Sequence, residues 1–202
     1  QHRAKYNIFF QSTHKLLEKY SMMSIEEQSN LADERLEMIR YICENIEGYI
    51  IYYNYPEIDN MVFGSYSNKV SSSFIYQVRK MNFELMNLAK EYKNLFICDL
   101  SGIQNTYGRN WLFDSTIYVS TEMLLSIESL PIIASRTLDI INSIEGKFKK
   151  CIILDLDNTL WGGVVGDDGW ENIQIGHGLG IGKAFSEFQE WIKALKNRGI
   201  IV

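Results

Sequence analysis

Cysteine and histidine are scarce in this chain of 202 residues, which has three of each. Cys43, Cys98 and Cys151 lie in apolar stretches, and no pair has Cys-x-x-Cys spacing, so neither a disulfide framework nor a zinc site is indicated. Reduced thiols in a cytosol fit this usage best. Cys151, set among Ile and Leu, is interpreted as a small buried hydrophobe.

Long apolar runs and basic blocks are also missing. No run approaches the roughly 18 apolar residues that cross a bilayer, and the N-terminus lacks the pattern of a signal peptide. The net charge is −5 and the sequence pI is near 5.3, without a Lys/Arg stripe. We therefore expect a cytoplasmic protein with no nucleic-acid or membrane partner. Its substrate can still be anionic if a metal bridges it.

What is present indicates an α/β fold. Hydrophobic residues make up 46% of the chain and aromatic residues 13%, enough for a buried core in one or two domains. Apolar runs at 49–53 and 95–98 predict buried strands, and a capping-box pattern at Ser24–Glu27 opens a helix that ends at Gly48. A second amphipathic helix starts at Phe74. Helices that alternate with strands indicate a mainly parallel sheet.

The later part of the chain is less regular. Residues 99–120 are interpreted as a loop, and a helix is predicted from Pro131 to Gly146 with Leu138 on its buried side. Gly146–Lys150 is the expected domain boundary. Beyond it we predict a strand at Ile152–Leu154, a hairpin around residues 166–169, a helix that ends at Gly199 and the start of another strand.

Two carboxylates end the predicted strand. Asp155 and Asp157 are one residue apart, so alternation along a strand places both on one face. Ligands of open α/β sheets bind beyond the carboxyl ends of strands. Mg²⁺ takes oxygen ligands and neutralises the repulsion between an anionic nucleophile and a phosphoryl group. The pair therefore indicates phosphate chemistry, with Asp155 as nucleophile and metal ligand, and Asp157 as general acid/base and metal ligand.

The residues around the pair support this interpretation. Asn158 tolerates the unusual backbone that a turn after a strand requires, and Thr159 is expected to hydrogen-bond locally and hold the turn. An EF-hand loop from Asp155 is excluded because Leu160 and Gly166 stand where Gly and Glu are needed. A metal-binding Asp-x-Asp of a glycosyltransferase and a purely structural Asp pair stay open. The latter is costly without a cation, because neighbouring carboxylates repel.

The segment Ile153–Leu160 resembles the first motif of the haloacid-dehalogenase (HAD) superfamily, and the longer run Lys150–Gly169 is similar to its FkbH-like branch, subfamily IIIC. The resemblance implies a Mg²⁺-dependent phosphatase, or a glyceryl transferase of polyketide biosynthesis that loads glycerate from an acyl phosphate onto an acyl carrier protein. In either case the partner is a phosphorylated small molecule. Thr159, Trp161, Gly162 and Gly163 are the candidate substrate-binding residues.

The resemblance also implies an arrangement of domains. Residues 1–146 look like the later part of an SGNH-hydrolase-like α/β domain, and residues 147–202 look like the first segment of a HAD-like Rossmannoid catalytic domain. No Gly-Asp-Ser nucleophile segment is present, which argues against esterase activity. The remaining HAD motifs are expected beyond Val202, so we expect a fragment that is itself inactive. The alternative is a non-catalytic docking module for a carrier protein or another subunit.

Overall fold

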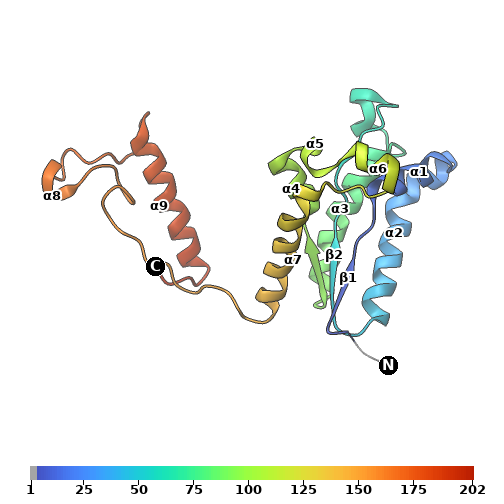
Figure 1. Cartoon of the computed structure of the whole chain (residues 1–202), viewed down its shortest axis with the longest axis horizontal. Coiled ribbons are helices and arrows are strands. Elements are labelled where there is room, and N and C mark those ends of the chain that lie inside the picture. Colours follow the sequence, from blue (N-terminus) through green and yellow to red (C-terminus); the bar gives the residue numbers. More distant parts are fainter. Residues whose placement is uncertain (1–3) are drawn as a thin grey trace. The chain divides into compact units, whose positions relative to one another are not determined.

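The computed structural model describes residues 4–202, which divide into two compact units, one ending at Ile144 and the other spanning Glu145–Val202. The first unit is built on a parallel sheet of three strands in the order β1-β2-β3. Figure 1 shows the helices packed around it. Its strands are β1 (Tyr6–Phe9), β2 (Tyr49–Tyr53) and β3 (Leu95–Cys98). The predicted α/β class and the two predicted strands of this unit are confirmed.

The central strand β2 shows why the sheet is covered on both faces. Ile50 and Tyr52 point into one core cluster, and Ile51 and Tyr53 into another, as expected from a period of two. The first cluster packs against α1 (Thr13–Ser21), α2 (Ile25–Asn45) and α3 (Phe74–Glu91), and the second against α4 (Leu100–Tyr107), α5 (Arg109–Leu112) and α7 (Leu130–Ile144).

The predicted capping box is present at the start of α2. The Ser24 hydroxyl accepts a hydrogen bond from the backbone N–H of Glu27 at 3.3 Å, and the Glu27 carboxylate accepts one from the Ser24 N–H at 2.7 Å. These contacts satisfy two backbone donors that an uncapped helix leaves free. The long amphipathic helix therefore starts at the position that the sequence indicates.

The loop expected at residues 99–120 is wrong. This segment forms α4, α5 and α6 (Ser115–Thr121), which are too short to show a clear helical period. Asp99 and Asp114 cap α4 and α6 by accepting backbone N–H bonds. Leu138 is also corrected: its side chain is 55% exposed, because Ile133 and Thr137 form the buried side of α7.

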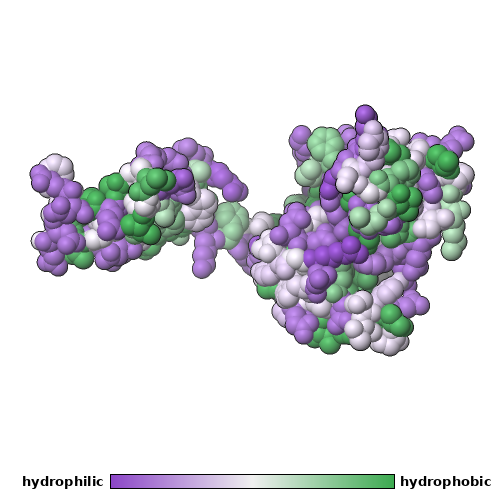
Figure 2. Space-filling model, turned by 90° about the horizontal axis from the view of Figure 1, so that it is seen from above, coloured by the Kyte–Doolittle hydropathy of each residue, from purple (hydrophilic) through white to green (hydrophobic). Residues whose placement is uncertain are grey.

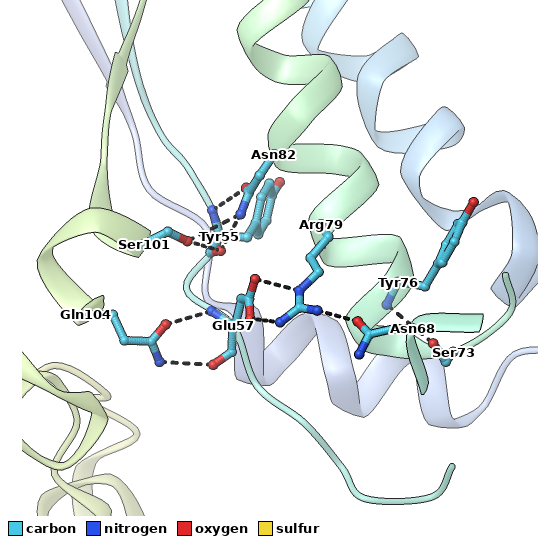
Figure 3. A network of polar contacts seen from close by, with 9 residues as sticks. All are labelled: Tyr55, Glu57, Asn68, Ser73, Tyr76, Arg79, Asn82, Ser101 and Gln104. Carbon is cyan, nitrogen blue, oxygen red and sulfur yellow. Dashed lines mark hydrogen bonds and ion pairs between the residues drawn. The ribbon is translucent and has the colours of Figure 1, made fainter. Parts of the chain in front are cut away.

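A polar network joins the carboxyl end of β2 to α3 and α4 (Figure 3). Asn82 accepts from the backbone N–H of Tyr55 at 2.9 Å and donates to its carbonyl at 2.7 Å. Gln104 pairs in the same way with the backbone of Glu57, at 2.8 and 2.9 Å. Two side-chain amides thus replace strand partners where the chain leaves the sheet, which fixes the loop after Pro56.

The second unit contains α8 (Val165–Asp168) and α9 (Ile181–Asn197). The predicted strand at Ile152–Leu154 is wrong, since only Cys151 forms a parallel bridge, to Ile201. A strand of a parallel sheet needs neighbouring strands to pair with. Within the described residues, the segment 151–154 pairs only with Ile201. Cys151 is exposed rather than buried. The predicted hairpin is reduced to a single antiparallel bridge between Gly162 and Gln174, with α8 between its arms.

Large hydrophobic side chains remain exposed in the second unit, as the hydrophobic patches on this unit in Figure 2 illustrate. They include Ile153, Leu156, Trp170, Leu179 and Trp191. No helix of the described residues combines the length and apolar character needed to cross a bilayer.

Candidate active site

The candidate site is the loop that carries Asp157. Its Oδ1 accepts a hydrogen bond from the indole Nε1 of Trp161 at 2.9 Å and another from the backbone N–H of Val165 at 3.2 Å. The side chain is partly buried by these contacts. Asp157 is therefore fixed through Oδ1, and its Oδ2 has no hydrogen-bond partner among the described residues.

Asp155 lies in a different environment. Its side chain is exposed, and Oδ1 accepts from the backbone N–H of Leu156 at 2.8 Å. The structure thus gives the two carboxylates unequal surroundings, although they are one residue apart. An exposed carboxylate is accessible to a reacting phosphorus atom, while a fixed carboxylate is suited to a defined proton transfer.

The turn between the two arms of the loop needs special backbone conformations. Asn158 has φ 53°, in the left-handed region that Asn tolerates better than most residues, as predicted. The Asn158 side chain accepts from the N–H of Gly163 at 2.9 Å, and Gly163 has φ 99°. A Cβ on Gly163 would lie 2.9 Å from a carboxylate oxygen of Asp168. These two positions close the loop on itself.

The predicted substrate-binding residues have structural partners in this loop. Thr159 donates its backbone N–H to the Leu156 carbonyl at 3.2 Å, a bond that does not involve its hydroxyl, so the role of the Thr159 side chain in holding the turn stays a prediction. A Cβ on Gly162 would stand 2.8 Å from the Gln174 side chain and 2.9 Å from the ring of Phe185. Trp161 binds Asp157, so it positions a carboxylate. Contact of these residues with a substrate stays a prediction.

Side chains of helix α9 form hydrogen bonds with the backbone of the loop and of the segment that follows it. Gln189 donates its side-chain N–H to the carbonyl of Leu160 at 2.7 Å, and Ser186 accepts from the N–H of Gly176 at 3.0 Å. Neither residue stands out in the sequence. The helical spacing of three residues between them is the signal that places both on one face of α9.

The donor chemistry of the loop fits Mg²⁺ in part. Asp155 and Asp157 offer carboxylate oxygens, which this cation prefers, and Mg²⁺ commonly binds one or two carboxylates together with waters and substrate phosphate. Within residues 4–202 no three His, Cys, Asp or Glu side chains gather into a group that would hold a metal ion. The loop therefore offers two carboxylates of the kind that Mg²⁺ binds.

A solved structure resembles the whole chain. It is described as the crystal structure of the N-terminal part of the protein BF1531 from Bacteroides fragilis, containing a phosphatase domain and complexed with Mg. The similarity has a TM-score of 0.95 with 64% sequence identity, and covers 98% of this chain and 53% of that one. This chain thus spans about half the length of the solved chain.

None of the curated proteins matches the sequence. Residues 1–142 match the family described as FkbH, N-terminal domain. This match takes in the three-stranded sheet, its helices and nearly all of the first compact unit. The resemblance inferred from the residues around Asp155 is confirmed, and the chain belongs to the FkbH family.

Proposed function

We propose that this chain carries the nucleophile loop of a Mg²⁺-dependent, HAD-type phosphoryl-transfer enzyme. In this proposal the first unit is an SGNH-hydrolase-like domain and the second is the N-terminal segment of the catalytic domain. The observation that carries the proposal is the unequal setting of the two carboxylates, with Asp155 exposed and Asp157 held by Trp161 and Val165.

The first step uses both carboxylates. A carboxylate oxygen of Asp155 attacks the phosphorus atom, the bond from phosphorus to the leaving-group oxygen breaks, and an aspartyl-phosphate forms. Asp157, protonated on the oxygen that the loop leaves free, gives its proton to the leaving group. When bound, Mg²⁺ would be held by Asp155, and by Asp157 only while that carboxylate carries no proton, and it would neutralise the charge that otherwise keeps phosphate and carboxylate apart.

The second step reverses the role of Asp157. Its carboxylate takes a proton from a water molecule, which attacks the phosphorus atom and releases Asp155 as inorganic phosphate leaves. In a glyceryl transferase no aspartyl-phosphate forms: the thiol of an acyl carrier protein gives its proton to the Asp157 carboxylate and attacks the acyl carbon of the acyl phosphate. A thioester forms, the bond from the acyl carbon to the phosphate oxygen breaks, and inorganic phosphate leaves. The resemblance to FkbH-like proteins supports glyceryl transfer. The acceptor distinguishes the two reactions, because it is water in a phosphatase and a thiol in a glyceryl transferase.

Acid-quench mass spectrometry on the full gene product, with an activated phosphate ester and Mg²⁺, tests the roles. Asp155→Asn should form no phosphoprotein. Asp157→Asn should slow turnover by roughly 10²–10⁴-fold, the usual range for loss of a general acid/base, and accumulate phosphoprotein when the leaving group needs little protonation. Asp167→Asn, an exposed carboxylate of α8, is the matched control and should behave as the unaltered protein. A phosphorylated Asp155→Asn protein would exclude Asp155 as nucleophile.

A further inference from the structure

The first unit has a cavity of about 630 Å³ where α1 follows the carboxyl end of β1. Its lining comes from α1, α5, α6 and η2 (Ile127–Ser129). The lining side chains that matter for binding are His14, Arg109, Trp111, Phe113, Tyr118 and Glu128. Crevices beyond the carboxyl ends of parallel strands are the usual ligand sites of α/β domains.

The walls of this cavity are fixed by hydrogen bonds between segments distant in sequence. The backbone N–H of Asp114 donates to Leu124 at 3.1 Å, and the Ser126 hydroxyl donates to the Trp111 carbonyl at 2.6 Å. Tyr118 donates its hydroxyl to Glu18 of α1 at 2.8 Å. These bonds within the chain hold the walls of the cavity in place, so little further ordering is needed when a ligand binds.

His14 contributes a nitrogen to the cavity. Its ring packs edge-on against Phe113, with centroids 5.0 Å apart, and lies 5.8 Å from the ring of Tyr118. Nδ1 is enclosed and has no hydrogen-bond partner within the described residues. Nε2 is thus the nitrogen that can reach a ligand, and a proton on it makes it a donor.

Arg109 contributes a positive charge. Its side chain is exposed, and no residue of the described chain accepts a hydrogen bond from its guanidinium. The planar fork of arginine matches a carboxylate or a phosphate. The carboxylates of Asp114 and Glu128 also border the cavity, and they disfavour a ligand with two negative charges. The two carboxylates therefore penalise a phosphate dianion more than a single carboxylate, which Arg109 can pair alone.

We propose that this cavity binds a small monocarboxylate that carries an aromatic or apolar group. The carboxylate binds Arg109 and the Nε2–H of His14, and the apolar group lies against Phe113, Tyr118 and Trp111. All of these residues belong to the first unit, and the proposal does not rest on the proposed phosphoryl transfer.

NMR of the histidine ring protons tests the proposal with the whole chain, since the sequence has only three histidines. Benzoate is the probe, benzyl alcohol its uncharged counterpart, and inorganic phosphate the dianion. Benzoate should shift the His14 signals saturably at millimolar concentration. Benzyl alcohol should bind at least about tenfold more weakly, because a hydrogen-bonded charge is lost.

Two arginine variants complete the test. Arg109→Gln should weaken benzoate binding by about tenfold or more, since an exposed arginine is replaced without disturbing the core. Arg136→Gln, an exposed arginine of α7 outside this cavity, should bind benzoate as the unaltered chain does. The proposal is overturned if benzoate leaves the His14 signals unchanged, if Arg109→Gln binds equally well, or if phosphate binds more tightly than benzoate.

Discussion

Trp161 donates its indole N–H to Oδ1 of Asp157 across 2.9 Å, from four residues further along the chain. Replacing Asp157 with Ala removes the acceptor, so the indole N–H resonance of Trp161 should move upfield and exchange with water faster. The measurement is a nitrogen–proton correlation spectrum, in which the chain's four tryptophans give separate signals.

Asp155→Ala is the matched control, because Asp155 binds only the backbone of Leu156. The Trp161 signal should stay in place in this variant. An equal shift in both variants would mean that the loop rearranges as a whole, and that Trp161 does not position Asp157 specifically.

The polar network at the end of β2 predicts that two substitutions on α3, at Asn82 and at Arg79, lower the stability of the protein by very different amounts. Asn82→Ala leaves the N–H of buried Tyr55 without its partner, while the Tyr55 carbonyl keeps the bond from the Ser101 hydroxyl at 2.7 Å (Figure 3). An unsatisfied buried polar group costs about 1–3 kcal/mol, so the free energy of unfolding should fall by about that amount. Urea denaturation measures it.

Arg79→Gln is the control for this change. Arg79 forms a two-contact ion pair with Glu57, at 2.8 and 2.6 Å, but both side chains are substantially exposed. Exposed pairs contribute about 0–1 kcal/mol, so this variant should lose far less stability than Asn82→Ala. Equal losses in the two variants would contradict the structural role of Asn82.

The sequence predicts the first unit better than the second for a physical reason. The helices at 25–45 and 74–91 and the strands at 49–53 and 95–98 carry long apolar patterns that find partners within the same unit. Ile152–Leu154 has the same apolar pattern but finds only the bridge from Cys151 to Ile201. An apolar run predicts a strand only where neighbours exist, and a local pattern does not contain that information.

In the candidate site, too, some features could be predicted from the sequence and others could not. Asn158 was predictable, because a turn residue with positive φ favours Asn or Gly. The bonds from Trp161 and Gln189 were not, since they depend on how the loop folds onto Asp157 and α9. His14 and Arg109 come from segments 95 residues apart in the sequence, and no spacing rule joins them.

The environment of His14 predicts a pH dependence of stability. Burial, and then the positive charge of Arg109, lower its pKa below the ordinary value of 6.5, while Glu18 acts in the opposite direction. The unfolded chain therefore binds more protons than the folded chain below about pH 6.5, and stability falls as the pH drops through this range. Titration of the His14 ring protons by NMR measures the folded pKa.

Variants that remove one charge each separate the contributions of Arg109 and Glu18 to the pKa of His14. Arg109→Gln should raise the pKa of His14, and Glu18→Gln should lower it, because each removes one electrostatic contribution. Arg136→Gln should leave the His14 titration unchanged. A pKa of His14 at or above 6.5 in the unaltered chain would contradict the burial seen in the structure.

The three cysteines should differ in reactivity. Cys43 and Cys98 are buried, and burial raises the pKa of the Cys43 thiol to about 11 and that of Cys98 above its ordinary value. Cys151 is exposed. Iodoacetamide should therefore label Cys151 first in the folded chain, and all three only in denaturant. Peptide mass spectrometry identifies the sites, and early labelling of Cys98 would show that the second core cluster opens.

Metal binding by the 202-residue chain alone depends on two neighbouring carboxylates. Asp155 and Asp157 give Mg²⁺ only two carboxylates, and within residues 4–202 no third acidic, histidine or cysteine side chain joins them. We therefore expect weak Mg²⁺ binding and no turnover of a phosphate monoester or acyl phosphate, because the phosphate has no further ligands. Calorimetry with MgCl₂ and a phosphate-release assay with and without EDTA measure the two quantities. Turnover that EDTA abolishes, and that Asp155→Asn also removes, would show that this chain holds a complete active site.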